Sequence, residues 1–289
     1  MIVRTVDGRE LLVALAGAES GPAVIFHHGW PACRLLPPEF AEAASARGFR
    51  LVSFDRAGYG GSSRLPGRRV ADAAADTAAI ADALGLASFS VWGFSGGGPH
   101  ALACAALLPA RVVAAVVVAG LAPFGSPGLD FCAGMGEASR EEFAVARRGY
   151  DVYEPFVCEA VANFLATPRG GGADGFDSLL SPPDLAFVRG PAADYLDTSG
   201  HEALHAGPDG WLDDGLAIVA PWGFDLTAVQ ASVLLLQGGL DLMVPPAHAR
   251  AMARALPRRR LVLEPEEAHL TLGFAPERPL DWLADGAPI

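Results

Sequence analysis

A serine flanked by glycines is the feature of this sequence that most directly suggests chemistry. Residues 93–97 read GFSGG, a G-x-S-x-G pattern centred on Ser95. The apolar run SFSVW precedes the pattern and ALACAALL follows it, which predicts a strand, a tight turn and a helix. A sharp turn of this kind would expose the Ser95 hydroxyl as a nucleophile, and the glycines would let neighbouring chain segments approach closely.

The same residues also fit a dinucleotide-binding motif. Residues 96–101 read GGGPHA, which matches G-x-G-x-x-A. That motif needs an acidic residue about 20 positions further on to bind a ribose, but the first acid after it is Asp130. A Walker-type phosphate loop needs a lysine, and the chain contains none. Because both phosphate-binding interpretations lack a partner residue, we favour a nucleophilic serine.

A serine nucleophile needs a base to take its proton and an acid to orient that base. In a strand–helix fold with this turn, the expected chain order is Ser, then Asp or Glu, then His, the last two after later strands. Asp241 follows the apolar run in LLLQGGLDLMVPP, and His269 follows the final apolar run in RLVLEPEEAHLTL. Asp225 is a rival acid, but it precedes its strand. We therefore predict Ser95 as nucleophile, His269 as base and Asp241 as orienting acid.

The elements that must position these residues alternate along the chain. Asp7 and Gly8 lie between two apolar runs and predict a hairpin. Further apolar runs predict strands at 23–28, 50–55, 88–92, 112–120, 232–237 and 260–264. Helical patterns cover 38–47, 67–86, 99–108, 245–256 and the chain from about 276. Apolar strands that alternate with helices are typical of an α/β fold with a mostly parallel sheet covered on both faces.

The alternation is interrupted between residues 124 and 221. This stretch is broken by Gly and Pro, contains helical segments and has no long β-branched run. Within it, GGGADG at 170–175 predicts a loop. We predict a core formed by residues 1–123 and 222–289, into which residues 124–221 are inserted as a helical lid.

The composition limits the partners that the chain is expected to have. Its 289 residues are 51% hydrophobic, which is enough for a large core. A net charge of −12 argues against nucleic acid and anionic membrane surfaces as partners. The four cysteines include no C-x-x-C pair, which argues against a disulfide framework or a zinc cluster. The N-terminus lacks a signal-peptide apolar region, so we expect a cytoplasmic protein whose partner is a small molecule.

Four motifs in order resemble those of the α/β-hydrolase superfamily, specifically its serine-nucleophile branch with a helical lid, which includes esterases and perhydrolases. They are HGWP at 28–31, DRAGYGGS at 55–62, GFSGG at 93–97 and G-x-x-D-x-x-V-P at 238–245. The resemblance covers nearly the whole chain and implies an α/β-hydrolase fold.

The resemblance also implies roles for particular residues. It implies a catalytic triad of Ser95, Asp241 and His269, and an oxyanion hole made by the backbone N–H groups of Trp30 and Gly96. Two positions depart from the usual pattern: relatives have Gly where Ala268 stands and His where Gln237 stands. Candidate substrate contacts are the aromatic residues Trp30, Phe94, Trp211 and Trp222. Asp213 and Asp214, which lie close to Trp211 in the sequence, are further candidates. Structural roles are expected for His28, Asp55, Arg56 and His100.

The activity implied by the resemblance is cleavage of an ester, thioester or lactone through an acyl-enzyme, with no metal or organic cofactor. Perhydrolases, C–C hydrolases and lyases use the same triad and remain alternatives. An iminopeptidase-like activity would require acidic lid residues, such as Glu154 or Glu159, to hold a substrate amine. A non-catalytic ligand-binding protein on this fold is the remaining alternative, since fold alone does not settle function.

Overall fold

The centre of the structure is an eight-stranded sheet with the strand order β1-β2-β4-β3-β5-β6-β7-β8. The computed structural model describes residues 1–167, 177–190 and 192–289, so the loop predicted at 170–175 lies outside the described residues. The strands are β1 (Ile2–Arg4), β2 (Glu10–Gly17), β3 (Ala23–His27), β4 (Arg50–Phe54), β5 (Phe89–Phe94), β6 (Val112–Val118), β7 (Ser232–Gly238) and β8 (Arg259–Glu264). Each of them corresponds to an apolar run or a hairpin arm predicted from the sequence.

Most of this sheet is parallel. The first two strands form the predicted antiparallel hairpin, and β2 also pairs antiparallel with β4. The other neighbours pair parallel, with Phe26 of β3 opposite Trp92 of β5, for example. Because parallel strands all point the same way, the segments that follow β3, β5, β7 and β8 leave the sheet at one edge, where α/β folds place their sites.

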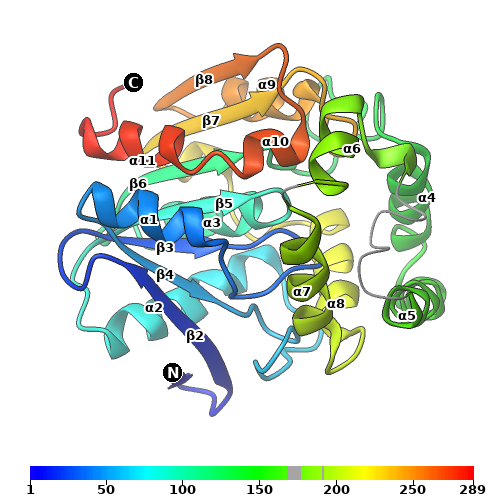
Figure 1. Cartoon of the computed structure of the whole chain (residues 1–289), viewed down its shortest axis with the longest axis horizontal. Coiled ribbons are helices and arrows are strands. Elements are labelled where there is room, and N and C mark those ends of the chain that lie inside the picture. Colours follow the sequence, from blue (N-terminus) through cyan, green and yellow to red (C-terminus); the bar gives the residue numbers. More distant parts are fainter. Residues whose placement is uncertain (168–176, 191) are drawn as a thin grey trace.

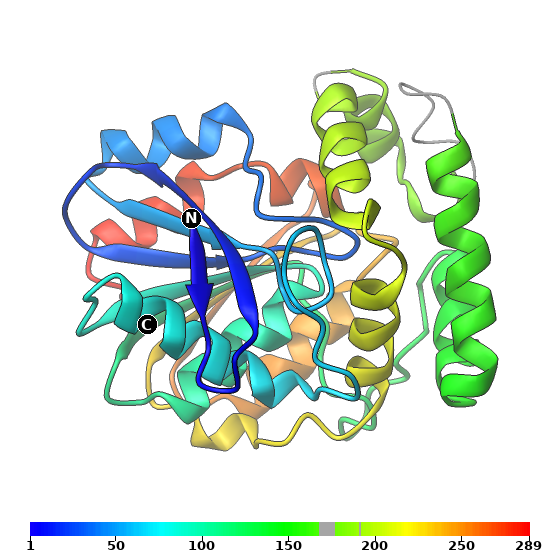
Figure 2. The same cartoon turned by 90° about the horizontal axis from the view of Figure 1, so that it is seen from below.

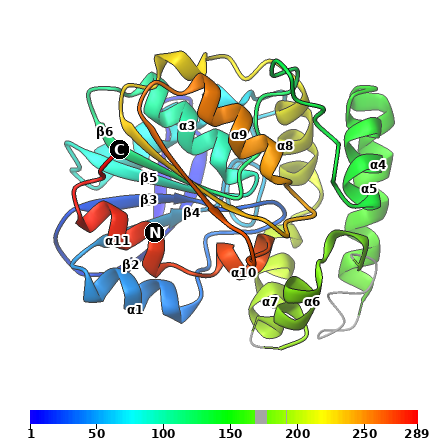
Figure 3. The ribbon, with the colours of Figure 1, turned by 90° about the horizontal axis from the view of Figure 1, so that it is seen from above.

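Helices cover both faces of the sheet (Figure 3). On one face lie α1 (Pro38–Ala46) and α11 (Glu277–Ala284); on the other lie α2 (Ala73–Ala83), α3 (Gly97–Leu107) and α9 (Pro246–Ala255). Successive strand residues point to opposite faces, and so Val24 and Phe26 pack in one buried cluster while Ile25 packs in the other. The predicted fold class, a mostly parallel sheet covered on both faces, is confirmed.

A group of helices between β6 and β7 lies beyond the carboxyl ends of the strands (Figures 1 and 2). They are α4 (Glu137–Ala146), α5 (Tyr150–Ala166), α6 (Pro182–Val188), α7 (Ala193–Leu204) and α8 (Asp209–Val219). These helices have an apolar cluster of their own, which includes Tyr153, Val157 and Leu204. Cys33 and Tyr59, from loops of the sheet domain, complete that cluster, so the inserted helices share buried surface with the core.

Asp214 on α8 ties the inserted helices to the core through a buried charge cluster. Its carboxylate accepts hydrogen bonds from Arg56 at 2.5 Å, from Arg68 at 2.6 Å and from the Tyr59 hydroxyl at 2.9 Å. His100 Nε2 lies 3.1 Å from the same carboxylate. Burial raises the pKa of Asp214, but the two guanidinium groups outweigh this and hold that pKa well below its ordinary value. The carboxylate is therefore occupied, which corrects the expectation that Asp214 contacts substrate.

We expect Asp214→Ala to lower the free energy of unfolding by about 3–5 kcal/mol, because Arg56 and Arg68 would stay buried without a counter-charge. Asp209→Ala is the matched control on the same helix. Its carboxylate is 42% exposed and pairs with Arg64, so its removal should cost less than about 1 kcal/mol. Urea denaturation of both variants measures the difference, and equal losses would contradict the structural role of Asp214.

Candidate active site

Ser95 lies on the turn between β5 and α3 with a left-handed backbone, φ 53°. Its N–H donates to the Val118 carbonyl at 2.9 Å, and its own carbonyl accepts from Gly98 N–H at 2.9 Å. A non-glycine residue in this region is strained, and such strain concentrates at functional positions. The backbone conformation therefore matches the exposed-nucleophile turn predicted from the sequence.

Two neighbouring glycines make this turn possible. A Cβ atom at Gly93 would lie 2.4 Å from the Gly97 carbonyl oxygen, and one at Gly97 would lie 2.0 Å from the His27 carbonyl oxygen. Both distances are far below contact distance, so a side chain at Gly93 would push away the start of α3, and one at Gly97 would push the turn away from β3. The glycines of GFSGG are explained by backbone packing around Ser95.

Asp241 and His269 form a buried pair after β7 and β8. The Asp241 Oδ2 accepts from His269 Nδ1 at 2.8 Å and from Gln237 Nε2 at 3.0 Å. The other oxygen, Oδ1, accepts from the N–H groups of Met243 at 2.9 Å and Val244 at 2.7 Å. Donation from Nδ1 leaves Nε2 of the imidazole as the proton acceptor. Gln237, one of the two departures from the usual pattern, thus helps to fix the acid.

Ser95 and His269 line the same cavity, which has a volume of about 440 Å³. The ring centroids of Phe94 and His269 lie 5.0 Å apart, so Phe94 packs beside the imidazole. In the described part of the chain, Ser95 Oγ forms no hydrogen bond. The geometry thus places a strained serine and a carboxylate-paired histidine on one cavity wall.

The loop after β3 faces this serine. The N–H groups of Trp30 and Gly96 have no hydrogen-bond acceptor among the described residues. The indole of Trp30 covers Gly96 so closely that a Cβ there would lie 2.6 Å from the ring. His28 has the structural position expected of it, because its Nδ1 lies 2.6 Å from the Gly29 carbonyl and its Nε2 accepts from Arg56 N–H at 3.1 Å. Two unpaired amides next to a serine can bind a negatively charged oxygen.

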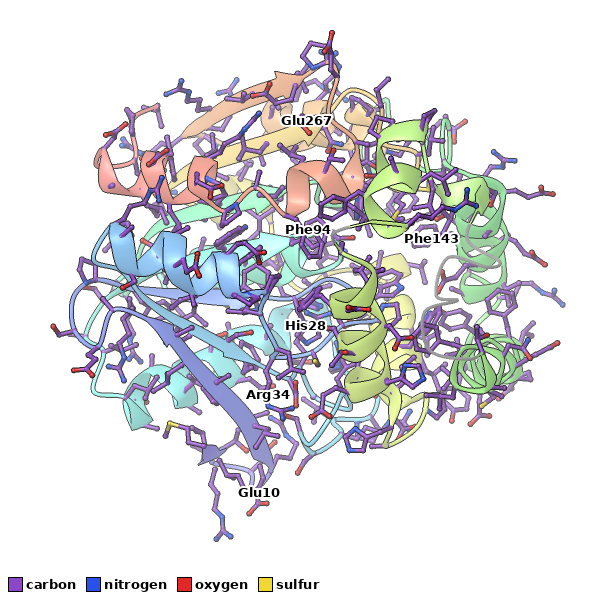
Figure 4. The ribbon with its side chains drawn as sticks, viewed as in Figure 1. Glu10, His28, Arg34, Phe94, Phe143 and Glu267 are labelled. Carbon is purple, nitrogen blue, oxygen red and sulfur yellow. The ribbon has the colours of Figure 1, made fainter. Side chains whose placement is uncertain are left out.

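The aromatic candidates fall into two groups. Trp30, Phe94 and Trp211 line the cavity, and Figure 4 shows Phe94 at the sheet end with Phe143 on the side of the inserted helices. Trp222 lies in the core instead, where its indole N–H donates to the Ile218 carbonyl at 3.3 Å. It packs in the core cluster and does not line this cavity, which corrects the prediction that it contacts substrate.

The remaining polar candidates are engaged in structural contacts. Asp213 accepts from Arg64 at 2.8 Å. Asp55 accepts from the N–H groups of Arg34 at 2.6 Å and Gly61 at 3.1 Å, as expected for a residue that ties the loop after β4. No group of three or more His, Cys, Asp or Glu residues in the described ranges is arranged to hold a metal ion.

Asp184 is a site residue that the sequence did not reveal. It lies on α6 and accepts hydrogen bonds from three consecutive N–H groups, those of His269 at 3.0 Å, Leu270 at 2.8 Å and Thr271 at 3.1 Å. These groups begin α10 (His269–Gly273), whose N-cap position is Ala268. Alanine has no side-chain oxygen to cap a helix, so a carboxylate from the inserted helices does so.

This cap also bears on the protonation of the histidine. Burial lowers the pKa of His269, but the charge and hydrogen bond of Asp241, with a further contribution from Asp184, raise it above its ordinary value. Asp184 thus affects both the position of the imidazole and its basicity. The sequence around Asp184, which reads SPPD at 181–184, indicates the start of a helix. It contains no signal that would connect Asp184 with His269.

Comparison with known proteins is consistent with this arrangement. Residues 22–140 match a family model described as the alpha/beta hydrolase fold. A thermophilic esterase from Thermogutta terrifontis has a similar structure over 99% of this chain and 98% of its own, with a TM-score of 0.68 and 26% identity. The chain has the α/β-hydrolase fold and resembles enzymes of that superfamily.

Curated relatives of this α/β hydrolase are also enzymes. A rhodomycin D methylesterase from Streptomyces sp. (strain C5) is 27% identical over 269 residues, which are 90% of this chain and 88% of that protein. A non-heme chloroperoxidase from Streptomyces lividans is 35% identical over 123 residues, which are 42% of this chain and 45% of that protein. The chain is an α/β-hydrolase enzyme of esterase type. In the described residues, no helix is both long and apolar enough to cross a membrane.

We expect Asp184→Asn to lower the pKa of His269, because the variant removes a negative charge that favours the imidazolium ion. The variant also loses one of the two carboxylate oxygens that cap α10, which should lower the free energy of unfolding by about 1–2 kcal/mol. An NMR pH titration of the imidazole measures the first effect. Glu267→Gln is the control, since Glu267 lies two residues before His269 and pairs with Arg278. Equal shifts of the His269 pKa in both variants would contradict the role of Asp184.

Proposed function

We propose that this enzyme hydrolyses a carboxylic ester of a small molecule through a triad of Ser95, His269 and Asp241. The observation that carries the proposal is the left-handed Ser95 on the wall of a cavity that His269 also lines. The hydrogen bond between His269 Nδ1 and Asp241 supports the assignment of base and orienting acid.

The proposed reaction has two steps. Ser95 Oγ attacks the ester carbonyl while His269 Nε2 takes its proton, and the N–H groups of Trp30 and Gly96 stabilise the oxyanion. The imidazolium then gives the proton to the leaving alcohol, which leaves an acyl-enzyme. In the second step His269 removes a proton from water, the hydroxide attacks the acyl group, and the carboxylic acid and free Ser95 are formed.

We also propose that residues 124–221 act as a lid that shapes the substrate pocket. Side chains from this inserted segment line the cavity that Ser95 also lines, among them Phe143, Leu180 and Trp211. Their apolar character favours a substrate with an apolar or aromatic body. The similarity to a rhodomycin D methylesterase over 90% of the chain supports an ester, including a methyl ester, as the reacting bond.

We expect Ser95→Ala to abolish labelling by a fluorophosphonate and to lower kcat/KM for 4-nitrophenyl butyrate by at least about 1000-fold, since removal of a triad nucleophile has effects of this size. Ser139→Ala is the matched control, because Ser139 lines the same cavity. That variant should keep both labelling and turnover. Labelling of the Ser95→Ala variant would contradict the proposed nucleophile, and a folded wild type that never labels would favour a non-catalytic binding protein.

Perhydrolysis is a second candidate, favoured by the 32% identity over 126 residues to a bifunctional esterase/perhydrolase from Acinetobacter calcoaceticus. Hydrogen peroxide would replace water in the second step and attack the same acyl group, which yields a peroxycarboxylic acid and free Ser95. We expect an enzyme adapted to this reaction to form peroxyacetic acid from acetate and hydrogen peroxide faster than it hydrolyses 4-nitrophenyl acetate. A direct assay of peroxyacid decides the matter, and ester hydrolysis without peroxyacid would exclude this candidate.

A further inference from the structure

Glu142 on α4 lines the cavity but has no part in the proposed hydrolysis. Its Oε1 accepts two hydrogen bonds, from the Tyr153 hydroxyl and from Trp211 Nε1, each at 2.6 Å. Its Oε2 has no hydrogen-bond partner in the part of the chain that the structure describes. Glu142 contributes to the cavity wall, and its Oε2 is not fully enclosed by protein atoms.

The inserted helices hold this carboxylate in a defined orientation. Tyr153 is fully buried and Trp211 is 5% exposed, so neither donor can move freely. A Cβ atom at Gly215 would lie 2.1 Å from the Tyr153 hydroxyl oxygen, which means that only glycine at this position leaves room for the donor. Trp211 and Gly215 are one helical turn apart on α8 and therefore face the same side. With Oε1 fixed by two donors, the direction of Oε2 is fixed as well.

The charge of Glu142 has no counter-charge among the residues that the structure describes. Burial raises the pKa of its carboxyl group, and the hydrogen bonds from Trp211 and Tyr153 offset this only in part. No cation pairs with Glu142 among the described residues. Two neutral donors need only one carbonyl oxygen, which glutamine would provide at a lower desolvation cost. Oε2 thus lacks both a hydrogen-bond donor and a cation among the described residues.

Other acidic side chains of the inserted helices do not share these properties. Glu154 accepts from the Tyr150 hydroxyl, and Glu159 is exposed; neither lines the cavity. Asp197 lines it but lies 3.6 Å from His201 within its own helix. Asp184 is occupied by the amides of α10.

Glu142 is also well placed relative to the reacting atoms. Its neighbour Phe143 packs against Trp30, with ring centroids 6.0 Å apart. Trp30 in turn covers Gly96, one of the two proposed oxyanion donors. Glu142 therefore contributes to the cavity wall from the inserted helices, together with the aromatic residues Phe143 and Trp211.

We propose that Glu142 Oε2 accepts a hydrogen bond from a donor group of the substrate, an ammonium or a hydroxyl group carried on an apolar body. The proposal rests on the hydrolysis proposed at Ser95, and it narrows the substrate class to esters that carry such a donor. The cavity would then have two functional groups: the Ser95 hydroxyl, which attacks the ester, and the Glu142 carboxylate, which binds the donor group of the substrate.

Glu142→Gln tests this directly. Glutamine keeps a carbonyl oxygen for Tyr153 and Trp211, but it replaces Oε2 with an amide NH₂ that donates. The substrates are 4-nitrophenyl esters of phenylacetic and 3-phenylpropanoic acids with a para methyl, hydroxyl or aminomethyl group. In the wild type we expect kcat/KM for one or both donor-bearing esters to exceed that of the methyl ester by about tenfold or more. In Glu142→Gln this preference should disappear, because the amide NH₂ cannot accept a hydrogen bond from either donor group.

Asp197→Asn is the matched control, since it neutralises another acid of the same cavity and should keep the preference. A preference for the hydroxyl ester alone, or for the aminomethyl ester alone, identifies the donor. A wild type without any preference, or an equal loss on all esters in Glu142→Gln, would overturn the proposal. If Glu142→Gln does not fold, as judged by its melting temperature, the wild-type preference alone decides.

A binding measurement separates this proposal from the hydrolysis itself. The amides of the same acids are titrated calorimetrically into Ser95→Ala and into the Ser95→Ala, Glu142→Gln double variant. Tighter binding of the donor-bearing amides to the first variant only would support the role of Glu142 even if no ester is hydrolysed. Equal binding of all amides to both variants would refute it, whatever the result of the labelling at Ser95.

Discussion

The close approach of the Ser95 turn to the end of β3 is the constraint on which the rest of the site depends. The chain can make this approach only because Gly97 has no side chain to meet the His27 carbonyl. The contact brings the Gly96 amide beside the loop that carries Trp30, and it forces Ser95 into a left-handed conformation. Backbone packing therefore sets both the exposure of Ser95 and the position of the Gly96 and Trp30 amides around it.

The parallel sheet extends this constraint to the other site residues. Since β3, β5, β7 and β8 run in the same direction, the loops after them leave at one edge. His269, hydrogen-bonded to Asp241, thus lines the same cavity as Ser95. The hydrogen bonds from Gln237 and from two loop amides then fix the acid, and the acid fixes the imidazole. Precision at the site thus comes from a series of short contacts on a rigid frame.

Three carboxylates of the inserted helices have distinct roles. Asp214 neutralises two buried arginines and joins α8 to the core, and Asp184 caps the helix that begins at His269. Of these three carboxylates, only Glu142 has an oxygen without a hydrogen-bond partner among the described residues. The inserted helices are therefore more than a cover over the cavity, because their attachment to the core also supports the imidazole.

The strands, the main helices and the three proposed triad residues could be predicted from the sequence, because local hydrophobic patterns and turn glycines carry that information. The order Ser95, Asp241, His269 along the chain was also informative, because loops that follow parallel strands lie at the same edge of the sheet. Asp184 could not be found in this way, since its partners are 85 to 87 positions away and are backbone amides. Nor could Trp222 be separated from Trp211, because only packing decides which indole faces the core and which the cavity. The sequence by itself determined the elements and the chemistry that a nucleophilic serine requires, whereas the tertiary structure alone decided which distant side chains and amides complete the site.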